Sequence, residues 1–159
     1  MSQLKYLVIY FSLVAALILM ILPLPDWAQM YRPNWIALVL IYWSMALPQR
    51  VGLWFAFFCG IVLDTSLGTL LGQHTLALVI FVFFNLNFYQ RIRVLALTQQ
   101  AVYVFALLLI NQVIVAWVEG TLGRPTPLLA YFGAPLVGML IWPWVFVILR
   151  DIRRKALLR

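Results

Sequence analysis

Residues 97–118 read LTQQAVYVFALLLINQVIVAWV, a stretch without a single charged side chain. A bilayer core about 30 Å thick is crossed by roughly 20 mostly apolar helical residues, so this stretch predicts a transmembrane helix. The rest of the chain has the same character, because 66% of its 159 residues are apolar and only 9% are charged. A mean hydropathy of +1.04 excludes a water-soluble domain of this size. The sequence therefore predicts an all-α, polytopic integral membrane protein.

Prolines, glycines and charged residues divide the chain into apolar segments that predict six transmembrane helices in a single domain, residues 1–159. The predicted spans are residues 6–22, 34–47, 51–66, 74–89, 97–118 and 128–149. The second span begins after Pro33 and ends before Pro48, so it covers only about 21 Å at a rise of 1.5 Å per residue. We expect it either to thin the bilayer or to be partly shielded by neighbouring helices.

The basic residues predict the orientation, because Lys and Arg in short loops stay on the cytoplasmic side of a membrane. With both termini in the cytoplasm, all but two of the 11 basic residues lie on the inner side. The two exceptions are Arg32 and Arg124. Aromatic residues near the predicted helix ends are expected at the membrane surfaces: Trp27, Tyr31, Trp35, Trp117 and Tyr131 outside, and Tyr89, Trp142 and Trp144 inside.

Asp64 needs an explanation, because an ionisable group is costly inside a membrane and is therefore a functional candidate. It lies near the outer end of the third predicted helix, where the helix dipole is unfavourable to an anion. Ala56 and Gly60 precede it at intervals of four, so the carboxylate shares a face with small residues and is expected to point into the bundle. Its candidate partners are Arg32, His74 and the amides of the turn that contains Gly68 and Gly72. Asp64 is then either a structural lock between helix ends or part of a ligand or partner pocket.

The sequence offers little equipment for catalysis. Thr65, Ser66 and His74 lie near Asp64, but no nucleophile elbow accompanies them, so a Ser/His/Asp hydrolase is not expected. The other acidic residues, all predicted near membrane surfaces, are Asp26, Glu119 and Asp151. Neither clustered carboxylates nor a His-Glu-x-x-His run is available for a metal ion. We therefore expect no enzyme, no cofactor and no bound metal.

The net charge of +7 lies beside membrane ends rather than on a soluble face, which argues against nucleic acid as a partner. The basic tail at residues 150–159 is interpreted as a topology anchor that attracts anionic membrane lipid. The alternative is a docking site for a cytoplasmic filament protein. The single cysteine, Cys59, excludes an intrachain disulfide and a cysteine-rich metal cluster.

Other polar and small residues have two interpretations each. In the fifth predicted helix Gln112 and Glu119 are seven apart on one face, where they either hydrogen-bond within the bundle or form a partner surface. Gly68 and Gly72 match a small-xxx-small pattern, but they fall at a predicted turn, so permissive backbone is their expected role.

Pro135 and Pro143 each remove a backbone hydrogen bond and are expected to bend the sixth helix. Trp142-Pro143-Trp144 is then a kinked aromatic element near the inner membrane surface. It serves either as an anchor or as a face that receives another transmembrane helix.

Several of these motifs resemble the MreD family of rod shape-determining proteins. Arg32-Pro-Asn-Trp35, with Tyr42-Trp43 and Ala46-Leu-Pro-Gln-Arg-Val51, resembles the second-helix region of that family, and Gly60-Ile-Val-Leu-Asp64 resembles its central motif. Trp142-Pro-Trp144 before a basic tail resembles its C-terminus. The resemblance spans nearly the whole chain, with the same six-helix plan. The motif positions that it transfers are Arg32, Pro33, Asn34, Trp35, Gly60, Asp64, Gly68, Gly72, Trp142 and Pro143.

The resemblance implies a non-enzymatic subunit of the bacterial cell-elongation complex in the inner membrane. It implies MreC as a partner and, through the complex, the actin-like MreB, the polymerase RodA and a penicillin-binding transpeptidase. It also implies a fold similar to the substrate-binding membrane subunits of energy-coupling-factor transporters. The alternative function is a small-molecule or lipid-binding subunit of a transporter, with an outer-facing cavity beside Asp64 and His74.

Overall fold

The computed structural model describes residues 2–29, 31–68, 70–123 and 128–158. Every regular element in this part of the chain is a helix, which confirms the all-α class. The helices are α1 (Ser2–Ile21), α2 (Asp26–Gln29), α3 (Trp35–Ala46), α4 (Leu53–Leu67), α5 (Gln73–Ile92), α6 (Leu97–Thr121) and α7 (Leu128–Leu158). The four-residue helix α2 is not predicted from the sequence, because Pro23 and Pro25 indicate only a connection there.

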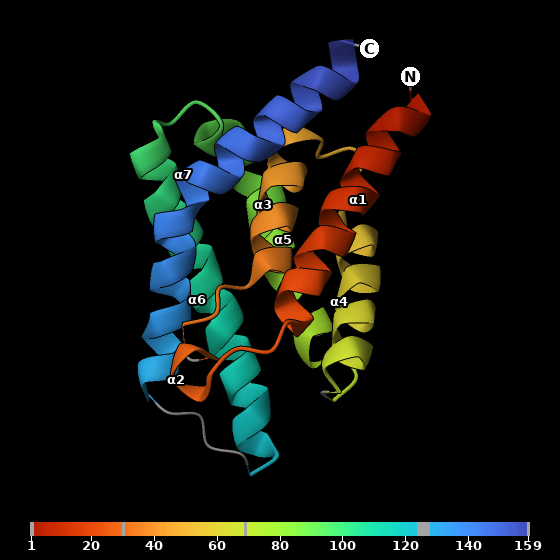
Figure 1. Cartoon of the computed structure of the whole chain (residues 1–159). Helices are drawn as coiled ribbons and strands as arrows, with labels where there is room; N and C mark the ends of the chain where they lie inside the picture. Colours follow the sequence, from red (N-terminus) through yellow and green to blue (C-terminus); the bar gives the residue numbers. More distant parts are fainter. Residues whose placement is uncertain (1, 30, 69, 124–127, 159) are drawn as a thin grey trace.

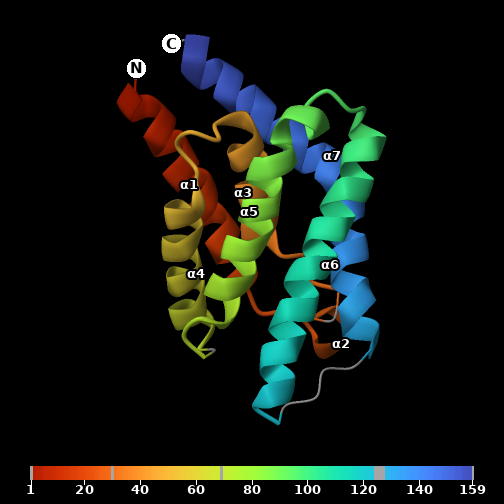
Figure 2. The same cartoon turned by 180° about the vertical axis from the view of Figure 1, so that it is seen from behind.

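The six longer helices alternate in direction, so their ends gather at two ends of one bundle (Figure 1). Both chain termini lie at the same end, which we call the terminal end, together with the α3–α4 and α5–α6 connections (Figure 1, Figure 2). The opposite, distal end holds α2, the α4–α5 turn, the end of α6 and the start of α7.

The short helix α3 forms the centre of the bundle. Every residue from Ile36 to Met45 is buried, and α3 packs against α1, α5, α6 and α7. A helix that is apolar on all sides is stable where protein surrounds it. The expected shielding of this segment by its neighbours is therefore confirmed, and its small length need not match the lipid.

Within the described residues, three helices are long and apolar enough to cross a membrane: α5, α6 and the part of α7 from Gly133 to Ala156. Shorter apolar helices lie at Tyr6–Ile21, Trp35–Ala46 and Leu53–Leu67. Length and composition thus identify a membrane protein. The last helix continues beyond residue 149 to Leu158, so the described part of the basic tail is helical.

The helix α7 contains both Pro135 and Pro143 and is visibly bent (Figure 1). Trp142 and Trp144 within it have opposite surroundings, since Trp142 is 0% exposed and Trp144 is 72% exposed. Two positions along a helix differ by about 200°, so the two rings face opposite sides. The ring of Trp142 packs in the core beside Phe146, so it does not serve as an exposed aromatic anchor, whereas Trp144 is free to do so.

Candidate functional site

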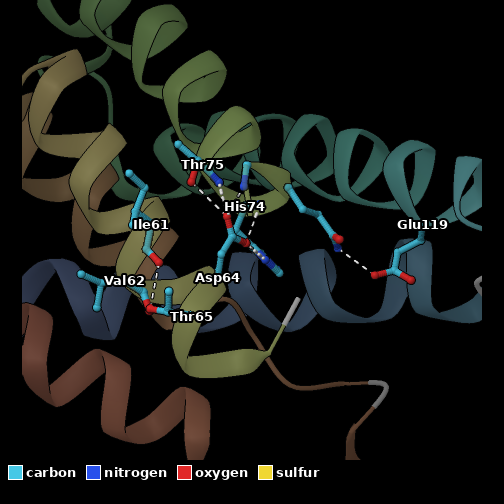
Figure 3. A network of polar contacts seen from close by, with 9 residues as sticks. Ile61, Val62, Asp64, Thr65, His74, Thr75 and Glu119 are labelled. Carbon is cyan, nitrogen blue, oxygen red and sulfur yellow. Dashed lines mark hydrogen bonds and ion pairs between the residues drawn. The ribbon is translucent and has the colours of Figure 1, made fainter. Parts of the chain in front are cut away.

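Asp64 lies near the C-terminus of α4 and is 0% exposed. The buried residues of α4 are Ala56, Gly60, Leu63 and Asp64. The carboxylate therefore points into the bundle from the face with small residues, as the spacing predicts. The first turn of α5 lies directly opposite (Figure 3).

The carboxylate accepts hydrogen bonds from the backbone at the start of α5 (Figure 3). The Gly72 N–H donates to Oδ2 over 3.0 Å, the His74 N–H to Oδ1 over 2.9 Å, and the Thr75 N–H to Oδ2 over 3.3 Å. Two side chains complete the shell. His74 Nδ1 lies 2.8 Å from Oδ1, and the Thr75 hydroxyl donates to Oδ2 over 2.9 Å. Both carboxylate oxygens are thus occupied by partners from one helix end.

Asp64 caps the N-terminus of a helix other than its own. The first N–H groups of a helix have no acceptor within the helix, and this end carries partial positive charge. Gly72 stands at the N-cap position of α5 with φ +103° and has no side chain to cap it. The carboxylate from α4 supplies the missing acceptor. The unfavourable dipole of α4, expected from the sequence, is therefore offset by the favourable dipole of α5.

Arg32, another expected partner of Asp64, binds the end of α1. Its guanidinium donates to the backbone carbonyls of Met20 and Leu22, where α1 terminates. The last carbonyls of a helix lack intrahelical donors, and a cation there complements the helix dipole. Arg32 is thus a C-terminal cap for α1.

The rest of this motif begins α3. The Asn34 side chain accepts a hydrogen bond from the Ala37 N–H over 3.1 Å, which is the standard N-cap contact. Pro33 is buried, and Trp35 is the first residue of the helix. The Arg32–Trp35 motif therefore closes one helix and opens another at the distal end.

Glu119 and Gln112 have different roles, although the sequence places them on one face of α6. Glu119 Oε1 accepts a hydrogen bond from Gln73 Nε2 over 2.9 Å, which ties α6 to the first residue of α5 (Figure 3). Gln112 lines a small cavity with Asn34 and Pro135 instead. The polar network around α5 thus joins α4, α5 and α6, and Gln112 lies outside it.

The glycines of the central motif have separate structural roles. Gly68 and Gly72 have φ values of +69° and +103°, which confirms the permissive backbone expected at this turn. Gly60 lies within α4, directly against the backbone of Thr75 in α5. It allows the close helix contact that brings Asp64 to its cap position one turn later.

The Thr65 hydroxyl donates to the carbonyls of Ile61 and Val62 within α4, over 3.0 and 2.9 Å (Figure 3). It therefore bonds within its own helix rather than to His74. Among the described residues, no three His, Cys, Asp or Glu side chains are grouped to hold a metal ion. The geometry at Asp64 is that of a helix cap.

Sequence reasoning missed two contributors to this network, Gln73 and Thr75. The sequence feature that could have identified them is their position, because they flank His74 in the first turn of α5. It also missed Asn85, whose Nδ2 donates to Ile41 O over 3.1 Å and also to the Ser44 hydroxyl, while Oδ1 accepts from the Tyr103 hydroxyl over 3.1 Å. This second network ties α3, α5 and α6 together in the core.

Comparison with known proteins gives two matches. The family model described as rod shape-determining protein MreD matches residues 1–152. The rod shape-determining protein MreD of Haemophilus influenzae is 35% identical over 164 residues, which cover 97% of this chain and 98% of that protein. No solved structure matches, so the expected similarity to energy-coupling-factor subunits gains no support.

Proposed function

The chain belongs to the MreD family of rod shape-determining proteins, and from this premise we propose that it is a non-enzymatic scaffold of the bacterial cell-elongation complex. It recruits or stabilises MreC and holds peptidoglycan synthases in one assembly. Through that assembly it is connected to MreB, RodA and a penicillin-binding transpeptidase. Its contribution to cell shape is structural.

The observation that supports a structural role is that both carboxylate oxygens of Asp64 already have hydrogen-bond partners within the chain. The most conspicuous buried acid is 0% exposed, and its oxygens accept bonds from Gly72, His74 and Thr75. A catalytic or ligand-binding carboxylate needs a lone pair directed at a reacting group or ligand. Asp64 instead directs both oxygens at a neighbouring helix, which suits a rigid support.

We propose that the bundle crosses the bacterial inner membrane six times, with the terminal end in the cytoplasm. The terminal end collects Arg50, Arg91, Arg93 and the basic residues at the end of α7. Arg32 is at the distal end, and Arg124 lies outside the described residues. This asymmetry is the one that orients membrane proteins.

We propose that the partner surface is an apolar groove of about 450 Å³ between α1 and α7. We call it the α1–α7 groove; Trp35 and Val39 of α3 also line it. Its α1 wall includes Ser12, Ala15 and Ala16 among larger apolar residues, and these small side chains allow a second backbone to approach closely. Close packing of this kind is what joins helices in a membrane, where lipid is as apolar as the side chains. The occupant that we propose is a transmembrane segment of MreC.

A transport subunit is the less favoured function. It requires a ligand to reach Asp64 and His74 from the outer side, yet Asp64 is fully buried and His74 is 8% exposed. A ligand would have to displace the first turn of α5 to reach the carboxylate.

Depletion of the protein from a rod-shaped host tests the scaffold directly in cells. We expect rods to become swollen or round, and the wild-type chain supplied in trans to restore them. Rods of normal width after complete depletion would contradict a role in shape.

A further inference from the structure

A polar cavity lies at the terminal end, at the opposite end of the bundle from Asp64. It measures about 140 Å³ and is formed by four helices and their ends. Its polar walls are Tyr42 of α3, Arg93 at the end of α5, Gln100 of α6 and Arg153 of α7. We call it the Tyr42 cavity. No role in the scaffold requires it.

Three buried polar atoms in its walls have no hydrogen-bond partner among the described residues: the Tyr42 hydroxyl, Gln100 Oε1 and Arg153 Nε. Tyr42 and Gln100 are each only 2% exposed. The orientation of the Gln100 amide is fixed, since its Nε2 donates to Ile92 O over 3.0 Å. Buried polar atoms without partners are costly, so these atoms indicate a missing polar group. The walls offer two donors and one acceptor.

The cavity also carries uncompensated positive charge. Arg93 and Arg153 both line it, and its lining includes no carboxylate from the described residues. The chain has only four acidic residues. Asp151 lies 3.6 Å from Arg150, while Asp26, Asp64 and Glu119 belong to elements at the distal end. Arg153 is half-buried and Arg93 is exposed, so the two guanidinium groups are accessible to an anion from outside the chain.

We propose that the Tyr42 cavity binds a ligand that carries both a phosphate group and a hydroxyl group. The guanidinium fork matches phosphate oxygens, the Tyr42 hydroxyl donates to the same anion, and Gln100 Oε1 accepts from the hydroxyl. Two sources have this chemistry: the glycerophosphate headgroup of an anionic lipid such as phosphatidylglycerol, and free hydrogen phosphate. The helices leave the membrane at this end under the proposed topology, which is the depth of lipid headgroups. The site does not depend on the scaffold function.

Native mass spectrometry of the full-length chain in mild detergent tests the site, with phosphatidylglycerol, phosphatidylcholine or inorganic phosphate added separately. We expect selective binding of phosphatidylglycerol over phosphatidylcholine. Arg153→Gln should weaken it about tenfold, as expected for a charge-assisted hydrogen bond. Tyr42→Phe keeps the buried ring and should weaken binding about threefold to tenfold.

Arg154→Gln is the matched control, because it removes the same charge from the adjacent, exposed position outside the cavity. It should leave phosphatidylglycerol binding within about twofold of wild type. Binding of inorganic phosphate with the same dependence on Arg153 and Tyr42 would support the site with a soluble ligand. Equal losses in Arg153→Gln and Arg154→Gln, or no binding of either probe by a folded chain, would overturn it.

Discussion

Gly60 and Thr75 are in contact through their backbones: a Cβ on Gly60 would lie 2.3 Å from the Thr75 Cα. One turn further along α4, Asp64 accepts hydrogen bonds from the N–H and the hydroxyl of the same threonine. The close approach and the cap are therefore one structural unit. The small residue brings α4 and α5 together, and the carboxylate then satisfies the exposed helix end.

Gly60→Ala should destabilise the bundle by about 1–3 kcal/mol, the usual cost of overpacking, because backbone atoms of α5 must shift. Thermal unfolding in detergent measures the effect. Gly120→Ala is the control, since a Cβ at Gly120 meets nothing within 4 Å in α6. Equal midpoints for the two variants would refute the close contact.

Asp64→Asn should lower the free energy of unfolding by about 2–4 kcal/mol, because an amide places N–H groups opposite the donors of α5 and removes the charge. Denaturant or thermal unfolding of the purified chain checks this value. The control is Asp151→Asn, whose side chain is 54% exposed and whose surface ion pair should contribute less than about 1 kcal/mol. Wild-type stability in Asp64→Asn would remove the structural role of the cap.

The proposed topology predicts that reporter fusions at residues 1 and 159 are both active in the cytoplasm. A reporter inserted after Gly123, at the distal end, should be active on the outer side. The three reporters together distinguish an even number of crossings from an odd one. Termini on opposite sides of the membrane would invalidate the assignment of both ends.

Ala15→Trp should fill the α1–α7 groove and reduce the recovery of MreC on the order of tenfold, equivalent to about 1.4 kcal/mol of binding. Quantitative copurification from membranes measures the loss. Ile18→Trp adds the same ring to α1 at a position that is 55% exposed and outside the groove, so it should retain MreC. Unchanged recovery in Ala15→Trp, at equal membrane abundance, would exclude the groove as the partner surface.

Hydropathy and charge alone predict the helical class, because in lipid the apolar segments must form helices that satisfy their own backbone. The four-residue spacing of Ala56, Gly60 and Asp64 correctly predicts an inward-facing carboxylate. It does not choose among the candidate partners, since Arg32, His74 and the turn amides can be distinguished only by how the helix ends meet; His74 and the Gly72 amide are the two that contact the carboxylate. The caps made by Asp64 and Arg32 act on a helix end distant in the sequence, and a periodic pattern within one helix does not reveal such a contact.

Trp142 shows the other limit of sequence reasoning. An aromatic residue near a predicted helix end is typical of the membrane surface, but the rotation of α7 places this ring in the core and Trp144 outside. The rotation is set by packing against α1, α3 and α6, which hydropathy does not describe. The short helix α2 and the unpartnered atoms of the Tyr42 cavity are likewise properties of the assembled bundle.

Purification of the wild-type chain from its native membrane in mild detergent, followed by measurement of the ratio of MreC to chain, tests scaffolding most directly. A fixed ratio that persists through size-exclusion chromatography is the expected result. Recovery of the folded chain without MreC, or with a stoichiometric bound metabolite in its place, would contradict it.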